Sequence, residues 1–152
     1  MKNEFKQTIL LYWALLAGQI IFALVVVFMT KSNTDAALNW PSGSFPGFIG
    51  PVVVLAGLMG ARTVNQMNMK NAPENAPFPE KVSHFRKSVI MRSALIEGCN
   101  LFMVVLTLLD NNLFWILCFA AGILGFWFFK PTLEEFSENY RLTYQDLQEV
   151  QR

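Results

Sequence analysis

Glu97 is the residue whose type and setting point most directly to chemistry. It lies inside an apolar stretch, nine residues after Ser88, which a helix would place about 13 Å below the edge of that stretch. An ionised carboxylate in hydrocarbon costs several kcal/mol unless it is protonated, paired or bound to a cation. Ser93 and Asn100 lie one turn to either side, and Gln19 falls at a similar depth in the first apolar stretch. These four side chains could form an oxygen-rich pocket for a proton or a hard cation such as sodium.

The same four residues also have a purely structural interpretation. A protonated or hydrogen-bonded Glu97 would tie helices together through Gln19 or Asn100, and no ion would move. The two interpretations predict the same residues in the same place. Both therefore stay open at the level of the sequence.

Other reactive side chains are too few to build a catalytic centre. His84 is the only histidine, so a multi-histidine metal site is excluded. Cys99 and Cys118 each lie in an apolar stretch, without the spacing of a secreted disulfide framework. The sequence contains no glycine loop followed by Lys-Ser or Lys-Thr that would hold a phosphate. We therefore expect no enzymatic activity, no metal and no cofactor.

The elements that must position Glu97 are apolar helices. Of the 152 residues, 53% are hydrophobic and 15% charged, against about 25% charged in soluble domains. The net charge of +1 gives no field that would recruit nucleic acid. This composition indicates an all-α integral membrane protein.

Four stretches have the length and polarity expected of membrane spans. A spanning helix takes about 20 apolar residues. Residues 9–29 and 88–109 meet that length. Residues 47–64 and 113–129 are slightly shorter, but the long side chains of Arg62 and Lys130 can reach from the ends of these stretches to the interface. Residues 1–130 are thus predicted to form a four-helix transmembrane domain. Its largest exposed loop, residues 66–87, should resist regular structure in its first half because of its prolines, and can resume as helix before Ser88.

The distribution of basic residues sets the orientation. With the N-terminus inside, Lys31 is the one Lys or Arg of twelve that is left outside. Basic residues concentrate on the cytoplasmic side of membrane proteins. Both termini are therefore expected in the cytoplasm, and a bacterial inner membrane is the expected location.

Residues 131–152 differ from the rest and are predicted to form one cytoplasmic amphipathic helix. Thr132 and Glu135 have the spacing of a capping box. From residue 132 onward there are five acids and two bases, a charge that disfavours anionic lipid. The apolar face should therefore dock on protein, either on the chain's own basic loop or on a separate partner. That face consists of Leu133, Phe136, Tyr140, Tyr144 and Leu147.

Small residues mark helix contacts in the second and fourth spans. Gly57 and Gly60, and likewise Gly122 and Gly125, lie about one turn apart, so a neighbouring backbone can approach closely. That neighbour belongs either to the same bundle or to another copy. The patterns at residues 14–18 and 94–98, and at 56–60 and 121–125, are also alike. They suggest two duplicated helical hairpins.

Part of the chain resembles a known family. The run from Gly57 to Arg62, the polar loop Asn71-Ala72-Pro73-Glu74, and Ala94-Leu95-Ile96-Glu97 with the apolar residues after it resemble the hairpin of rotary ATP synthase c-subunits. The resemblance covers about residues 47–109, without the dense glycine run of that family. It implies that Glu97 carries a proton or sodium ion, in a ring of copies facing a stator arginine on another protein.

Two functional hypotheses follow. The first is a small polytopic protein that acts as a non-catalytic subunit or scaffold of a larger membrane assembly. The alternative is a proton- or sodium-binding or translocating element that uses Glu97, whether c-subunit-like or a small transporter. The expected partners are membrane lipid and either further copies of the chain or other membrane subunits.

Overall fold

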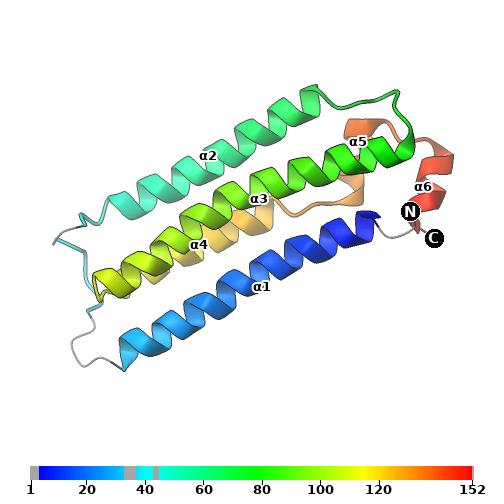
Figure 1. The fold of residues 1–152 in the computed structure, drawn as a ribbon. Coiled ribbons are helices and arrows are strands. Elements are labelled where there is room, and N and C mark those ends of the chain that lie inside the picture. The colour runs from blue at the N-terminus through cyan, green and yellow to red at the C-terminus, as the bar shows by residue number, and fades with distance from the viewer. Residues whose placement is uncertain (1–3, 33–36, 43–44, 152) are drawn as a thin grey trace.

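The computed structural model describes residues 4–32, 37–42 and 45–151, and within them the protein is all-α, with six helices. These are α1 (Glu4–Lys31), α2 (Ile49–Lys70), α3 (Phe78–Leu109), α4 (Phe114–Phe128), α5 (Leu133–Tyr140) and α6 (Tyr144–Gln151). Helices α1 to α4 lie side by side as a bundle, and α5 and α6 gather at the end where α1 begins (Figure 1).

Helix α3 is the centre of the bundle. It packs extensively against α1, α2 and α4, whereas α2 and α4 touch each other far less. Two apolar clusters fill the interior: one around Phe85, Phe126 and Phe136, and another around Met103 and Trp115 at the opposite end. Every other long helix is therefore positioned by its contact with α3.

Helix α1 joins the bundle along a narrow stripe. Its buried residues recur every three or four positions, which is the spacing of a single helix seam: Phe5, Thr8, Tyr12, Leu16, Gln19, Ala23, Val26 and Thr30. The remaining surface is apolar and exposed, for example at Leu10, Ile21 and Phe28. A helix that is apolar on all sides but buried on one is suited to lipid.

Two of the described helices, α1 and α3, are long and apolar enough to cross a membrane. A third span is counted if α4 and α5 are taken as one segment bent by 53°. Helix α4 alone has 15 residues, about 22 Å of helical rise, which is shorter than the roughly 30 Å of a hydrocarbon core.

The predicted extent of the loop at residues 66–87 is wrong, although helix does resume before Ser88 as expected. Helix α2 continues to Lys70 and α3 begins at Phe78, which leaves a short turn. The polar ends of the two helices bind each other, since Asn68 donates to Ser88 at 3.3 Å. Pro77 and Pro79 fit at the start of α3, where a helix has no need of their missing N–H groups.

The single helix predicted for residues 131–152 is also wrong. Arg141 adopts a left-handed conformation with φ 46°, which ends α5, and α6 begins at Tyr144. Thr143 caps the new helix, accepting from the backbone N–H of Asp146 at 3.3 Å, while the Asp146 carboxylate accepts from the N–H of Thr143 at 3.0 Å. Thr143 and Asp146 have the capping-box spacing, so the sequence does contain a signal for this second helix.

Candidate functional site

The four residues of the predicted intramembrane site lie on facing stretches of α1 and α3. Asn100 donates its side-chain N–H to Oε1 of Gln19 at 2.8 Å, and both side chains are buried. Ser93 is also buried. Glu97 is only partly buried, and among the described residues it takes part in no hydrogen bond or ion pair. The structure therefore brings Gln19 and Asn100 together and leaves Glu97 at the edge of the bundle without a hydrogen bond or ion pair.

Three polar atoms in this region lack partners within the described chain: Nε2 of Gln19, Oγ of Ser93 and Oδ1 of Asn100. A polar group buried without a hydrogen bond normally costs about 1–3 kcal/mol. The set contains a donor, an acceptor and a hydroxyl that can serve as either. Between Ser93 and Asn100, Glu97 adds a carboxyl group to the same stretch of α3.

The predicted packing glycines do not all have the same role. A Cβ atom added at Gly122 would lie 1.8 Å from Oδ1 of Asn100, so this glycine makes room for the amide that bonds Gln19. Gly57 and Gly125 accommodate Cys99 and Leu58 in the same manner. Gly60 is different, because an added Cβ would meet only Leu95, at 3.8 Å.

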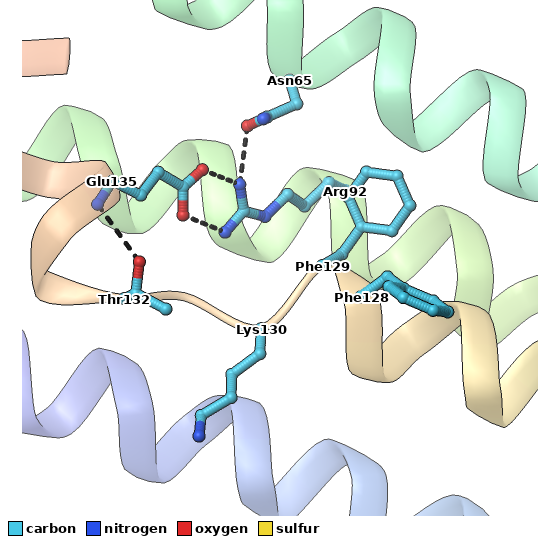
Figure 2. A pocket seen from close by; sticks show the side chains of 7 residues that line it. All are labelled: Asn65, Arg92, Phe128, Phe129, Lys130, Thr132 and Glu135. Carbon is cyan, nitrogen blue, oxygen red and sulfur yellow. Dashed lines mark hydrogen bonds and ion pairs between the residues drawn. The ribbon is translucent and has the colours of Figure 1, made fainter. Parts of the chain in front are cut away.

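A second polar site, which the sequence analysis did not find, is centred on Arg92 of α3. Figure 2 shows its guanidinium held by the Glu135 carboxylate and by Asn65. Nη2 donates to Oε2 of Glu135 at 2.8 Å, and Nη1 donates both to Oε1 of Glu135 and to Oδ1 of Asn65, the latter at 2.7 Å. The Arg92 side chain is 1% exposed and that of Glu135 18%. Such a two-point pair fixes the direction as well as the distance between its partners.

This ion pair borders a cavity of about 320 Å³ where the chain leaves α4 and turns into α5. Its walls include Phe128, Phe129 and Thr132, and Thr132 caps α5 by accepting from the N–H of Glu135 at 3.1 Å. Lys130 extends away from the ion pair in Figure 2 and places its ammonium 5.5 Å from the Trp13 ring. The capping box spacing was thus read correctly at Thr132, but the carboxylate of Glu135 bonds Arg92.

Polar contacts continue from this pair toward the start of α3. Lys81 and Asp146 form an ion pair at 3.5 Å, and His84 and Tyr140 share a hydrogen bond at 2.7 Å. With Arg92 and Glu135, these contacts pair earlier positions of α3 with later positions of α5 and α6. The C-terminal helices therefore run back along α3 in a fixed register.

Two titratable groups of the C-terminal helices are perturbed in this register. Burial raises the pKa of Tyr140, and the Glu135 carboxylate raises it further. Burial would raise the pKa of Asp146, but hydrogen bonds with Thr143 and the charge of Lys81 outweigh it, so the net pKa is lowered. Tyr140 is thus a neutral donor or acceptor, and Asp146 a carboxylate, at neutral pH.

The predicted docking face is divided between the chain itself and solvent. Phe136 and Tyr140 are fully buried, and the Phe136 ring lies 4.8 Å from Phe85 between centroids. Leu133 packs against the same cluster. Leu147 is partly buried, and Tyr144 is 77% exposed. The sequence left open whether this face docks on the chain itself or on a separate partner. In the structure, most of the face packs on the chain's own helices.

Comparison with known proteins adds no assignment. No protein-family model, curated protein or solved structure matches the chain. The resemblance to c-subunit hairpins therefore stays a prediction. Among the described residues, no group of three or more His, Cys, Asp or Glu side chains is placed to hold a metal ion.

Proposed function

We propose that the protein crosses the membrane four times, with both termini in the cytoplasm, and serves as a non-catalytic subunit or scaffold of a larger membrane assembly. The topology is supported by the arrangement of the bundle, because α2 and α4 lie alongside the long apolar helices α1 and α3 (Figure 1). Lipid that surrounds α1 and α3 also surrounds their neighbours. Lys130, which lines a cavity with Glu135 of α5, and Arg62, which lines a hollow with Phe128 and Phe129, then lie toward the cytoplasmic interface.

The observation that carries the proposal is the position of Glu97. Its carboxyl group lies within the apolar part of α3, partly open at the edge of the bundle, and has no hydrogen-bond partner in the described chain. A carboxyl group in that setting is unfavourable in lipid alone. A donor from another chain would satisfy it, and polar contacts of this kind hold membrane helices together. Further copies of this chain or other membrane subunits would supply that donor.

The proposal is tested by purification in a mild detergent, with native mass spectrometry to report the mass of the particle. We expect the wild-type chain in a stoichiometric complex, either with itself or with a second protein. Glu97→Leu should release the partner, while Glu97→Gln, which keeps hydrogen-bonding atoms, should retain it. Phe102→Leu, on the exposed surface of the same helix, is the matched control. A wild-type chain that is monomeric and alone, in lipid nanodiscs as in detergent, would contradict the proposal.

A proton- or sodium-binding function is the second candidate, and the unpartnered buried atoms favour it. Ser93 and Asn100 each offer one such oxygen on the stretch of α3 that carries Glu97, and Gln19 offers a donor, Nε2, from the facing stretch of α1. A cation bound there would take the oxygens of Ser93, Asn100 and Glu97 as ligands, and a water beside it would accept from Nε2 of Gln19.

Proteoliposomes separate the two functions. In the ion-binding case the wild-type protein moves protons or sodium and Glu97→Gln does not, although the assembly stays intact. In the scaffold case neither protein moves ions, and only Glu97→Leu changes the mass of the complex.

A further inference from the structure

Three hollows lie end to end along the interface between α2 and α4. The first, of about 490 Å³, has an apolar lining from both helices that includes Val54, Leu58 and Leu117. Leu58 also borders the second, of about 220 Å³, which extends to Arg62 and Phe128. Phe128 in turn borders the 320 Å³ cavity at Arg92. Neighbouring hollows share a lining residue, with Leu58 standing between the first two, and we call this row of hollows the groove, which is apolar at one end and polar at the other.

The packing of the bundle explains why a groove runs here. Helices α2 and α4 both pack closely on α3 and only loosely on each other. Leu58 bridges them near the middle, where the absence of a side chain at Gly125 leaves room for it. On either side of that contact, the space between the two helices is open.

The polar end of the groove offers donors suited to an anion. Arg62 is exposed and forms no ion pair within the part of the chain that the structure describes. Asn65 lies one turn further along the same face of α2. Its Oδ1 accepts from Arg92 and Ser88, which directs its Nδ2 donor elsewhere. A guanidinium and an amide N–H are typical ligands of a phosphate group.

The charge at the polar end fits one class of occupant. Among the described residues that line the groove, the one carboxylate, that of Glu135, is already neutralised by Arg92, so Arg62 leaves this end positive. From Arg62 to Pro51 at the apolar end, α2 rises about 16 Å, which is the length of wall that an acyl chain would follow.

We infer that this groove binds an anionic phospholipid of the cytoplasmic leaflet. Its phosphate lies at Arg62 and Asn65, and one acyl chain follows the apolar walls between α2 and α4. The leaflet follows from the four-span topology proposed above, whereas the groove itself does not depend on it. A transmembrane helix in the same place would leave the Arg62 guanidinium without an anion.

Native mass spectrometry of the full chain, released from a neutral detergent, tests the inference. The probes are phosphatidylglycerol, phosphatidylcholine and free glycerol phosphate. We expect one phosphatidylglycerol to bind in preference to phosphatidylcholine, and glycerol phosphate alone to be retained far less. Arg62→Gln should weaken the binding of phosphatidylglycerol about tenfold, as expected for loss of a charge-assisted contact. Arg86→Gln, another exposed arginine on the cytoplasmic side, should leave it unchanged.

A second pair of variants tests the apolar end. Ala121 lines the first hollow, so Ala121→Phe should lower the retention of phosphatidylglycerol, whereas Leu124→Phe on the exposed side of α4 should not. Equal losses from Arg62→Gln and Arg86→Gln would mean diffuse attraction and would overturn the site. Equal retention of glycerol phosphate would overturn the role of the groove, and a cross-linked second chain in it would show a protein occupant instead.

The topology is checked separately. A cysteine placed by Arg62→Cys should react with a membrane-impermeant maleimide only from the cytoplasmic side. Reaction from the outside would refute the assigned leaflet and the proposed topology but leave the lipid measurements standing. Loss of lipid binding with correct labelling would refute the lipid site alone.

Discussion

Buried polar groups are paired to different degrees at the end of the bundle that carries α5 and α6 and in its middle. At the end that carries α5 and α6, both terminal nitrogens of Arg92 are bonded, although its Nε has no partner in the described chain, and the ion pair of Lys81 with Asp146 holds α6 to α3. In the middle, the pair of Gln19 and Asn100 leaves one atom of each side chain without a partner. Buried polar groups with hydrogen-bond partners hold the helices in one arrangement. Buried polar groups without such partners are found where a ligand, a water or another chain supplies the hydrogen bond. The comparison places structure at one end and a candidate function in the middle.

The largest expected effect breaks the paired end. Glu135→Ala would leave the buried Arg92 guanidinium without its counter-ion, and removing one partner of a buried pair costs about 3 kcal/mol. The double variant Arg92→Met with Glu135→Leu should recover most of that loss, because it removes both charges. Thermal unfolding in detergent measures the three proteins. Equal stability of wild type and Glu135→Ala would show that the pair does not anchor α5.

A smaller effect is expected in the middle of the bundle. Gly122→Ala puts a methyl group 1.8 Å from Oδ1 of Asn100, so the amide must move and its bond to Gln19 is strained or lost. Overpacking of this kind costs about 2 kcal/mol. Gly60→Ala, with open space around its Cβ, is the control and should be neutral by the same unfolding assay. Equal tolerance of both substitutions would mean that the middle is loosely packed.

The smallest expected effect is a change in the stability of α6 with pH. The pKa of Asp146 is lowered in the folded protein, so its contribution is present above the ordinary value of 3.8 and is lost as the pH falls through the lowered folded value. The ion pair with Lys81 is a single long hydrogen bond at 3.5 Å, so we expect it to contribute about 1 kcal/mol. The protection of α6 amides against hydrogen exchange, relative to their intrinsic rate at each pH, should therefore fall only in acid, and Asp146→Asn should show low protection at neutral pH. If the α6 amides of Asp146→Asn are as well protected against exchange as those of the wild type, the contact with Lys81 does not stabilise α6.

Periodicity and apolar length predicted the long helices because those features are local. They also placed Gln19 and Asn100 at one depth, since both lie a countable number of turns into their helices. The pairing of Arg92 with Glu135 joins residues 43 positions apart, and no local pattern specifies it. The left-handed Arg141 was equally hidden, because glycine or asparagine usually occupies that conformation at a helix end. Opposite charges flanking apolar segments were the one signal that could have suggested the pair.

The single seam of α1 has a consequence for how the protein is made. Helix α1 leaves the ribosome first, yet most of its buried stripe faces α3, which is synthesised only after α2 and the turn at residues 71–77. Until then Gln19 has no partner from this chain, since Asn100 of α3 is the residue that bonds it. Because α1 is apolar around nearly all of its circumference, it is suited to an apolar surrounding during that interval.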